Sequence, residues 1–293
     1  MSVAYTISVS DANNDGTGIN FTAYLRTFRN SFEATSRGGF SGVTTGDVFD
    51  AEDPLGAKSY VTTNSESNGG DSVIFNATGK FIYDYFNGHV ISGKLSSLVF
   101  GADTTMTSIA GGDVKYTNSR DITISGFGGL TTTSESGEGM IMGDIMDGLT
   151  SSLTSLLATD SIIFKGSTGS DVFTGYSHND TIKGGAGNDR LGGAAGKDRI
   201  DGDTGNDVLT GGAHADTFYF ARRDGTDRIT DFEEGGAGRD VIEFQRGLFD
   251  NHADVLNNAV EWRGNLVISY AGGKLTLTDV LLDDLARGDF HLL

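Results

Sequence analysis

Between Gly166 and Tyr219 an aspartate recurs every nine residues, in six consecutive units. Each unit begins with glycine, carries aspartate at its sixth place and has a large apolar residue at its eighth place. The sixth places are Asp171, Asp180, Asp189, Asp198, Asp207 and Asp216. Carboxylate and carbonyl oxygens, in a pattern without thiols or imidazoles, are ligands that calcium prefers and zinc does not. The spacing therefore predicts a series of calcium sites.

The glycines at the first and fourth places of each unit are expected to shape a turn. Glycine adopts positive φ without steric cost and lets another backbone segment approach closely, so six residues can form a tight turn whose carbonyl groups point to a shared centre. The fourth-place glycines are Gly169, Gly187, Gly196 and Gly205. The last three residues of a unit are predicted to form a strand with the eighth side chain inward, so that two units make one coil. Coils stacked about 4.8 Å apart bring every second unit onto one edge, which predicts about four interior calcium sites.

The repeat continues in two less regular units after Tyr219. In the first, Gly225, Asp227 and Ile229 take the fourth, sixth and eighth places. The second runs over residues 235–243 and has Asp240 at its sixth place. Both are expected to bind calcium.

Histidine replaces glycine at the fourth place of two units, as His178 and His214. We interpret these residues as positions of a left-handed turn. A shared metal site is disfavoured because the two units lie two coils apart, roughly 10 Å.

The consensus of these units, G-G-x-G-x-D-x-U-x with U a large apolar residue, resembles the calcium-binding RTX repeat. The resemblance implies a parallel β-roll over residues 160–243, with calcium as its cofactor. A chain with an RTX block and no amino-terminal signal resembles the proteins exported by type I secretion, whose export signal lies at the carboxyl end. Millimolar extracellular calcium suits sites with dissociation constants of about 10⁻⁴ to 10⁻³ M.

The composition limits the classes of function. The chain has 40 acidic and 21 basic residues and a formal net charge of −19, which argues against nucleic acid and anionic membranes as partners. It contains no cysteine, so rigidity must come from core packing and bound metal. No apolar run is long enough to span a membrane.

The two ends of the sequence bear on localisation. The start has neither a basic region nor an apolar stretch, so no Sec-type signal peptide is expected. Residues 244–293 are predicted to cap the roll, because an open end exposes unpaired strand edges, and to carry a type I secretion signal. We therefore expect a secreted protein, extracellular or at the cell surface of a Gram-negative bacterium, with the type I secretion machinery as a partner.

Residues 1–159 are predicted to form a separate α+β domain. Apolar residues at helical spacing predict helices over residues 21–32 and 141–157. Strands are expected at residues 73–75, 80–86, 89–100 and 121–127, with turns at Thr78-Gly79 and Asn87-Gly88.

The stretch from Gly79 to Gly101 resembles the haem-ligand hairpin of the HasA-type secreted hemophores. Tyr83, the pair Phe86-Asn87 and His89 occupy the places of the ligating tyrosine, the turn and the histidine that hydrogen-bonds the phenolate. The run from Gly93 to Gly101 also matches. The resemblance implies a curved antiparallel sheet with helices, ferric haem b as a cofactor, and an outer-membrane haem receptor or other cell-surface partner. A phenol ligates ferric iron as phenolate, and an adjacent imidazole that accepts its proton strengthens the ligand.

Two interpretations of the amino-terminal half remain open. The turn between Tyr83 and His89 is two residues shorter than in the hemophores, and no histidine follows the first helix, where many of them place a second axial ligand. The first interpretation is haem binding for iron acquisition. The alternative is a calcium-dependent surface-layer, adhesion or matrix protein in which Tyr83 and His89 are a cross-turn pair. No H-E-x-x-H or G-x-S-x-G motif occurs, so we expect no enzymatic activity.

Overall fold

The structure is a computed structural model. It describes residues 4–11, 16–31, 36–40, 56–63, 72–84, 90–101, 105–108, 114–117, 119, 121–127, 131–132, 150–236 and 238–293. The chain divides into two compact units. The first consists mainly of Val3–Ile7 and Ala23–Leu156, and the second mainly of Ser8–Thr22 and Leu157–Leu293. The predicted domain limits at residues 159 and 243 stay predictions.

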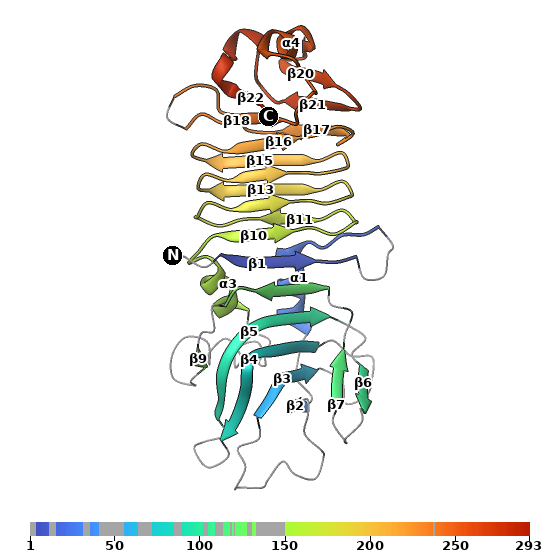
Figure 1. Cartoon of the computed structure of the whole chain (residues 1–293), viewed down its shortest axis with the longest axis vertical. Helices are drawn as coiled ribbons and strands as arrows, with labels where there is room; N and C mark the ends of the chain where they lie inside the picture. Colours follow the sequence, from blue (N-terminus) through green and yellow to red (C-terminus); the bar gives the residue numbers. More distant parts are fainter. Residues whose placement is uncertain are drawn as a thin grey trace. The chain divides into compact units, whose positions relative to one another are not determined.

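The first unit is built on an antiparallel sheet whose central strands are long and curved (Figure 1). Its strand order is β2 (Ser36–Phe40), β3 (Gly56–Thr63), β4 (Ser72–Asp84), β5 (Val90–Gly101), β8 (Ile122–Ser125) and β1 (Tyr5–Val9). A short strand β9 (Thr131–Thr132) pairs with β5, and β6 (Thr105–Ser108) pairs with β7 (Val114–Thr117). Alternate residues of β4, β5 and β8 point into one apolar core, including Val73, Phe75, Leu98, Phe100, Ile122 and Ile124, all fully buried.

Two helices accompany this sheet. Helix α1 (Phe21–Ser31) agrees with the helix predicted from residue 21 to 32. Helix α3 (Ser151–Leu157) matches the end of the helix predicted over residues 141–157, whose earlier part lies outside the described residues. In the first unit, Tyr24 of α1 packs edge-on against Phe100 and donates a hydrogen bond to Asp121.

The predicted turn at Thr78-Gly79 is wrong, because β4 runs unbroken from Ser72 to Asp84. The pairing of β4 with β5 shifts register there: Ala77 faces Leu95, whereas Ile82 faces Ser92. Two more residues therefore lie on β4 than on β5 between these pairs. A glycine inside a strand commonly marks such a bulge, and Gly79 lies within it. The predicted turn at Asn87-Gly88 lies outside the described residues.

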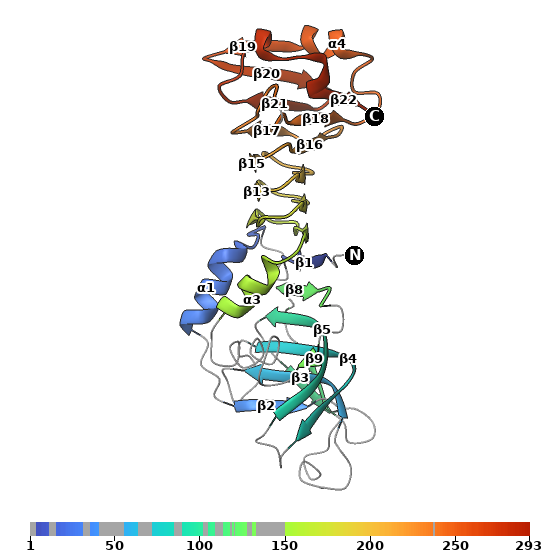
Figure 2. The ribbon, with the colours of Figure 1, turned by 90° about the vertical axis from the view of Figure 1, so that its left-hand side faces the viewer.

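The second unit contains two parallel sheets built from alternating repeats (Figures 1 and 2). One sheet contains β10 (Ile162–Lys165), β12 (Thr181–Lys183), β14 (Arg199–Asp201), β16 (Thr217–Phe220), β18 (Val241–Phe244) and β22 (Phe290–Leu292). The other contains β11 (Val172–Thr174), β13 (Arg190–Ala195), β15 (Val208–Ala213), β17 (Thr226–Ile229), β21 (Gly273–Leu277), β20 (Asn265–Tyr270) and β19 (Ala259–Trp262). Residues paired between the regular repeats are 18 apart, as in Ile182 with Ile200. This offset agrees with the predicted coil of two nine-residue units.

The carboxyl-terminal residues continue both sheets. Strand β21 pairs in parallel with β17, and β22 pairs in parallel with β18. Strands β20 and β19 then extend the second sheet in antiparallel fashion, with the short helix α4 (His252–Asn257) nearby in the chain. Among the described residues, no helix is long and apolar enough to cross a membrane.

Candidate calcium-binding site

The apolar residue at the eighth place of each repeat forms the interior of the roll. These side chains are at most 1% exposed: Phe173, Ile182, Leu191, Ile200, Leu209 and Phe218. Ile229 and Ile242, from the two irregular units, are fully buried as well. Because one large side chain per unit points inward, the turns that connect the strands bring the sixth-place aspartates to the two edges of the roll.

The aspartates form two hydrogen-bonded ladders, one along each edge. Except in the last aspartate of each ladder, the backbone N–H donates to Oδ1 of the aspartate in the next coil, at 2.7–3.0 Å. One ladder contains Asp171, Asp189, Asp207 and Asp227, and the other contains Asp180, Asp198, Asp216 and Asp240. All eight residues are at most 2% exposed. The irregular units therefore stay in register, although their aspartates follow the preceding ones by 20 and 24 residues.

The second carboxylate oxygen, Oδ2, distinguishes the ends of each ladder from its interior. At the ends, protein groups donate to it: Ser167 N–H to Asp171, Tyr176 N–H to Asp180, Tyr270 OH to Asp227 and Glu233 N–H to Asp240. In the interior, Oδ2 is buried without a hydrogen-bond partner in four residues: Asp189, Asp198, Asp207 and Asp216. A buried carboxylate oxygen without a donor is costly, so these four positions fit a cation.

Burial also perturbs the acidity of the interior aspartates. It raises the pKa of Asp207 to about 8, those of Asp189 and Asp216 to about 7, and that of Asp198 to about 6. The N–H bond from the neighbouring coil opposes this rise, and the nearby carboxylates of the same ladder add to it. These groups are therefore poor anions unless a positive charge accompanies them.

The first-place glycines leave space beside each carboxylate, which confirms the predicted close backbone approach. The predicted positive φ at this place is wrong, since none of these glycines has it. A β-carbon at Gly184 would lie 2.1 Å from Asp189 Oδ2 and 2.6 Å from the carbonyl oxygen of Gly202. At Gly193 the same atom would lie 2.2 Å from Asp198 Oδ2 and 2.6 Å from the next carbonyl oxygen. The absent side chain thus lets a carboxylate and a carbonyl oxygen converge, and both are hard ligands suited to calcium.

Positive φ falls instead at the second and fourth places of the turn. At the fourth place it occurs in Gly187, Gly196, Gly205 and His214, the last as predicted for a left-handed histidine. Gly169 and His178 do not share it. At the second place it occurs in the four interior units, in Gly185, Ala194, Asp203 and Gly212. In those units no second-place N–H donates to the aspartate, whereas Ser167 and Tyr176 of the first two units do.

Backbone carbonyls must complete any calcium ligand set. Among the described residues, no group of three or more histidine or acidic side chains converges as a metal site would require. A site that combines two carboxylates with turn carbonyls is consistent with this finding, because calcium accepts six to eight oxygen ligands of both kinds.

Residues 16–21 take the place of a missing coil beside the first repeat, which sequence reasoning did not find. Ile19 N–H donates to Asp171 Oδ1 at 2.5 Å, as the N–H of a preceding aspartate would in a regular ladder. Asn20 forms an isolated parallel β-bridge with Val172. Phe21 packs edge-on against Phe173, with 5.7 Å between the ring centroids. Phe21 is 2% exposed, so it acts as an eighth-place residue. No spacing rule could reveal this, because about 150 residues separate the two segments.

The Asp11 carboxylate accepts two hydrogen bonds. The N–H of Gly16 donates to Asp11 Oδ2 at 3.0 Å, and the Thr168 hydroxyl lies 3.5 Å from the same oxygen.

The predicted haem residues are only partly described. Tyr83 lies near the end of β4 and pairs with Ile91 of β5. Residues 85–89, which include Phe86, Asn87 and His89, lie outside the described residues. The two strands that flank this segment are antiparallel neighbours, as a hairpin requires.

Comparison with known proteins identifies the repeats. Residues 163–191 and 192–222 match the family model of the RTX calcium-binding nonapeptide repeat (4 copies). The chain therefore carries RTX calcium-binding repeats. No curated protein matches the chain in sequence.

Solved structures with some similarity include the apo hemophore HasA from Yersinia pestis, with 21% identity and a TM-score of 0.40 over 53% of this chain and 89% of that chain. The AlgE6R3 subunit of the mannuronan C5-epimerase from Azotobacter vinelandii has 29% identity and a TM-score of 0.35, over 42% and 77%. The extracellular lipase LipA from Serratia marcescens has 17% identity and a TM-score of 0.38, over 80% and 31%.

Proposed function

We propose that the chain is a secreted protein whose carboxyl-terminal unit folds around calcium outside the cell. The observation that carries this proposal is the set of four buried Oδ2 atoms without donors, in Asp189, Asp198, Asp207 and Asp216. Calcium would supply the positive charge that these carboxylates lack. At the low calcium concentration inside the cell, the carboxylates of each ladder would repel one another and the unit would stay unfolded. This suits export of an unfolded chain by type I secretion.

Calcium stoichiometry tests this proposal. Equilibrium dialysis should give about four interior sites in the parent protein. Asp189→Asn and Asp198→Asn should each lose a site, one on each edge. Asp283→Asn, at an exposed aspartate outside the ladders, is the matched control and should lose none. Equal stoichiometry in all four proteins would contradict the assignment.

A second proposal concerns the amino-terminal unit, which we infer binds ferric haem through Tyr83, with His89 assisting. It is supported by the hemophore-like sequence around the two residues, and by the pairing of Tyr83 with Ile91 on strands that flank the segment containing His89. Haem would provide the iron that such a protein acquires. A cell-surface receptor would then be the partner that removes it.

Absorption spectra after addition of hemin test the haem proposal. A tyrosinate-type charge-transfer band should appear and should vanish in Tyr83→Phe, while Tyr116→Phe on β7 keeps it. His89→Ala should weaken binding without abolishing it, because its role is to stabilise the phenolate. Binding should weaken in acid as His89 becomes protonated.

If the parent and Tyr83→Phe bind hemin equally, or neither binds at micromolar concentration, the haem proposal is wrong. A calcium-dependent surface-layer, adhesion or matrix role then takes its place, without altering the proposal for the roll. No catalytic activity is proposed for either unit.

A further inference from the structure

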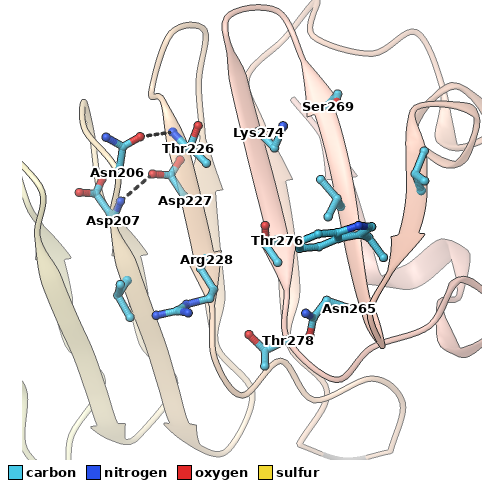
Figure 3. A pocket seen from close by; sticks show the side chains of 14 residues that line it. Asn206, Asp207, Thr226, Asp227, Arg228, Asn265, Ser269, Lys274, Thr276 and Thr278 are labelled. Atoms are coloured by element: carbon cyan, nitrogen blue, oxygen red, sulfur yellow. Dashed lines mark hydrogen bonds between the residues drawn. The ribbon is translucent and has the colours of Figure 1, made fainter.

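A groove of about 760 Å³ lies on the outer face of the second sheet, over β15, β17, β21, β20 and β19. Figure 3 shows its lining, with Asn206 just before β15, Arg228 on β17 and Thr276 on β21. Apart from Asp207 and Asp227, which belong to a ladder, none of its residues has a role in the functions considered above.

One row of paired residues crosses the groove. Cross-strand pairing joins Val208, Arg228, Thr276, Val267 and Val260 in that order. A second row joins Thr226, Lys274 and Ser269. Since alternate residues of a strand share one face, these side chains point outward together, away from the buried eighth-place residues.

The groove ends at an exposed aromatic residue. Trp262 is 58% exposed and Val260 of the same strand is 65% exposed, the two largest values among exposed large apolar side chains of the described residues. The Arg263 guanidinium lies 4.4 Å from the centre of the Trp262 ring and makes a cation–π contact with the indole. An indole left this open is a flat apolar platform with a polar N–H at its rim.

The exposed charges of the groove are opposite in sign to the net charge of the chain. Its exposed charged side chains are Arg228 and Lys274, and neither has an ion-pair or hydrogen-bond partner among the described residues. Its acidic members, Asp207 and Asp227, are at most 2% exposed and belong to the ladder. In a chain with a net charge of −19, two cations without acidic partners form a local site of opposite sign.

We propose that this groove binds an acidic polysaccharide, a chain of sugar rings that carry carboxylates. Trp262 would stack on the apolar face of one ring. Arg228 and Lys274 would pair with carboxylates of the polymer, the arginine in bidentate fashion. The hydroxyl groups of Thr226 and Ser269 provide donors and acceptors for sugar hydroxyls. An open, shallow face of this kind accommodates an extended polymer better than it encloses a small molecule.

Binding of a defined oligosaccharide tests the proposal. A hyaluronan hexasaccharide carries carboxylates and is too short to gel with calcium. It would be titrated by calorimetry into the full-length, calcium-saturated protein, with maltohexaose as the neutral comparison. Far-ultraviolet circular dichroism would verify the fold of every variant.

We expect the hexasaccharide to bind and maltohexaose to bind at least about tenfold more weakly. Trp262→Ala and the double variant Arg228→Gln/Lys274→Gln should each weaken binding about tenfold. The double variant should also flatten the dependence of affinity on salt. Arg246→Gln, an exposed arginine after β18, is the matched control and should bind as the parent does.

Three results would overturn the proposal. The first is no hexasaccharide binding at millimolar concentration by correctly folded protein. The second is equal binding by the parent and both groove variants. The third is equally tight binding of polyglutamate or single-stranded DNA with no effect of Trp262→Ala, which would show attraction of any polyanion instead of sugar recognition.

Discussion

The two units of this chain are stabilised in different ways. In the first, β4 and β5 are 13 and 12 residues long and bury apolar side chains that include Val73, Phe75, Leu98 and Phe100. In the second, β11, β12 and β14 are 3 residues long, and each repeat of nine residues places one large side chain in the interior. The second unit also buries eleven aspartates, eight of which form the two ladders. An apolar core can fold by itself, whereas a roll this thin with buried acids needs a further source of free energy.

Removal of calcium should have the largest effect, because it should unfold the roll and leave the first unit folded. In a chelator, we expect the roll to lose its structure, because the interior carboxylates then repel without a cation. The first unit should keep its protection around Phe75 and Phe100, which are fully buried. Hydrogen exchange followed by mass spectrometry resolves the two regions in one sample. Unchanged protection of residues 180–218 in the chelator would contradict this view of the roll.

Acid should partly replace calcium. The folded-state pKa values of the interior aspartates lie between about 6 and about 8, above the value near 3.9 of an unfolded chain. The folded state therefore binds more protons, so its stability rises as the pH falls through this range and the gain is complete near pH 4. In a chelator, the β-sheet signal should increase between pH 8 and pH 5. With saturating calcium the dependence should reverse, since protons then compete with the ion. A calcium-free signal that is flat over this range would argue against buried carboxylates as the source of the instability.

Two neighbouring glycines sharpen the comparison within a single coil. Gly193→Ala places a methyl group 2.2 Å from Asp198 Oδ2, so it should remove one calcium and cost about 3 kcal/mol. Gly192→Ala meets no atom closer than 3.4 Å and should change the free energy of unfolding by less than about 0.5 kcal/mol. Calcium titration and denaturant unfolding measure both effects. Equal tolerance of the two substitutions would mean that the first-place glycine does not reserve space for the ion.

Much of the roll could be predicted because its pattern is local. The sixth-place aspartates lie at the edges of the roll and the eighth-place residues in its interior, as the pattern predicts, even in the irregular units with Asp227 and Asp240. The role of these aspartates as calcium ligands stays a prediction. For the first-place glycine, close backbone approach is confirmed and positive φ is wrong, because the spacing of glycines does not reveal which of the two is needed. Only the crowding around Gly184 and Gly193 shows that the space matters.

Features that depend on distant partners could not be predicted in this way. The bulge around Gly79 was interpreted as a turn, because a glycine between two apolar runs looks the same in both cases. Asp201 occupies a variable ninth place, yet it is 4% exposed and pairs with Lys183 at 2.8 Å from the neighbouring coil. Residues 16–21 complete the ladder without any trace of the repeat.

The most local expected effect separates two residues of the same helix. Phe21 belongs to the second unit, where it packs on Phe173, while Leu25, one turn later, is 3% exposed and belongs to the first. Each truncation to alanine should cost about 3 kcal/mol, but in different places. Phe21→Ala should reduce hydrogen-exchange protection of residues 166–174 and leave residues 199–218 unchanged, because stacked repeats contact only their neighbours. Leu25→Ala should lower protection in the first unit and spare the roll. If both variants weaken the same residues, the division of helix α1 between two independently stabilised units is wrong.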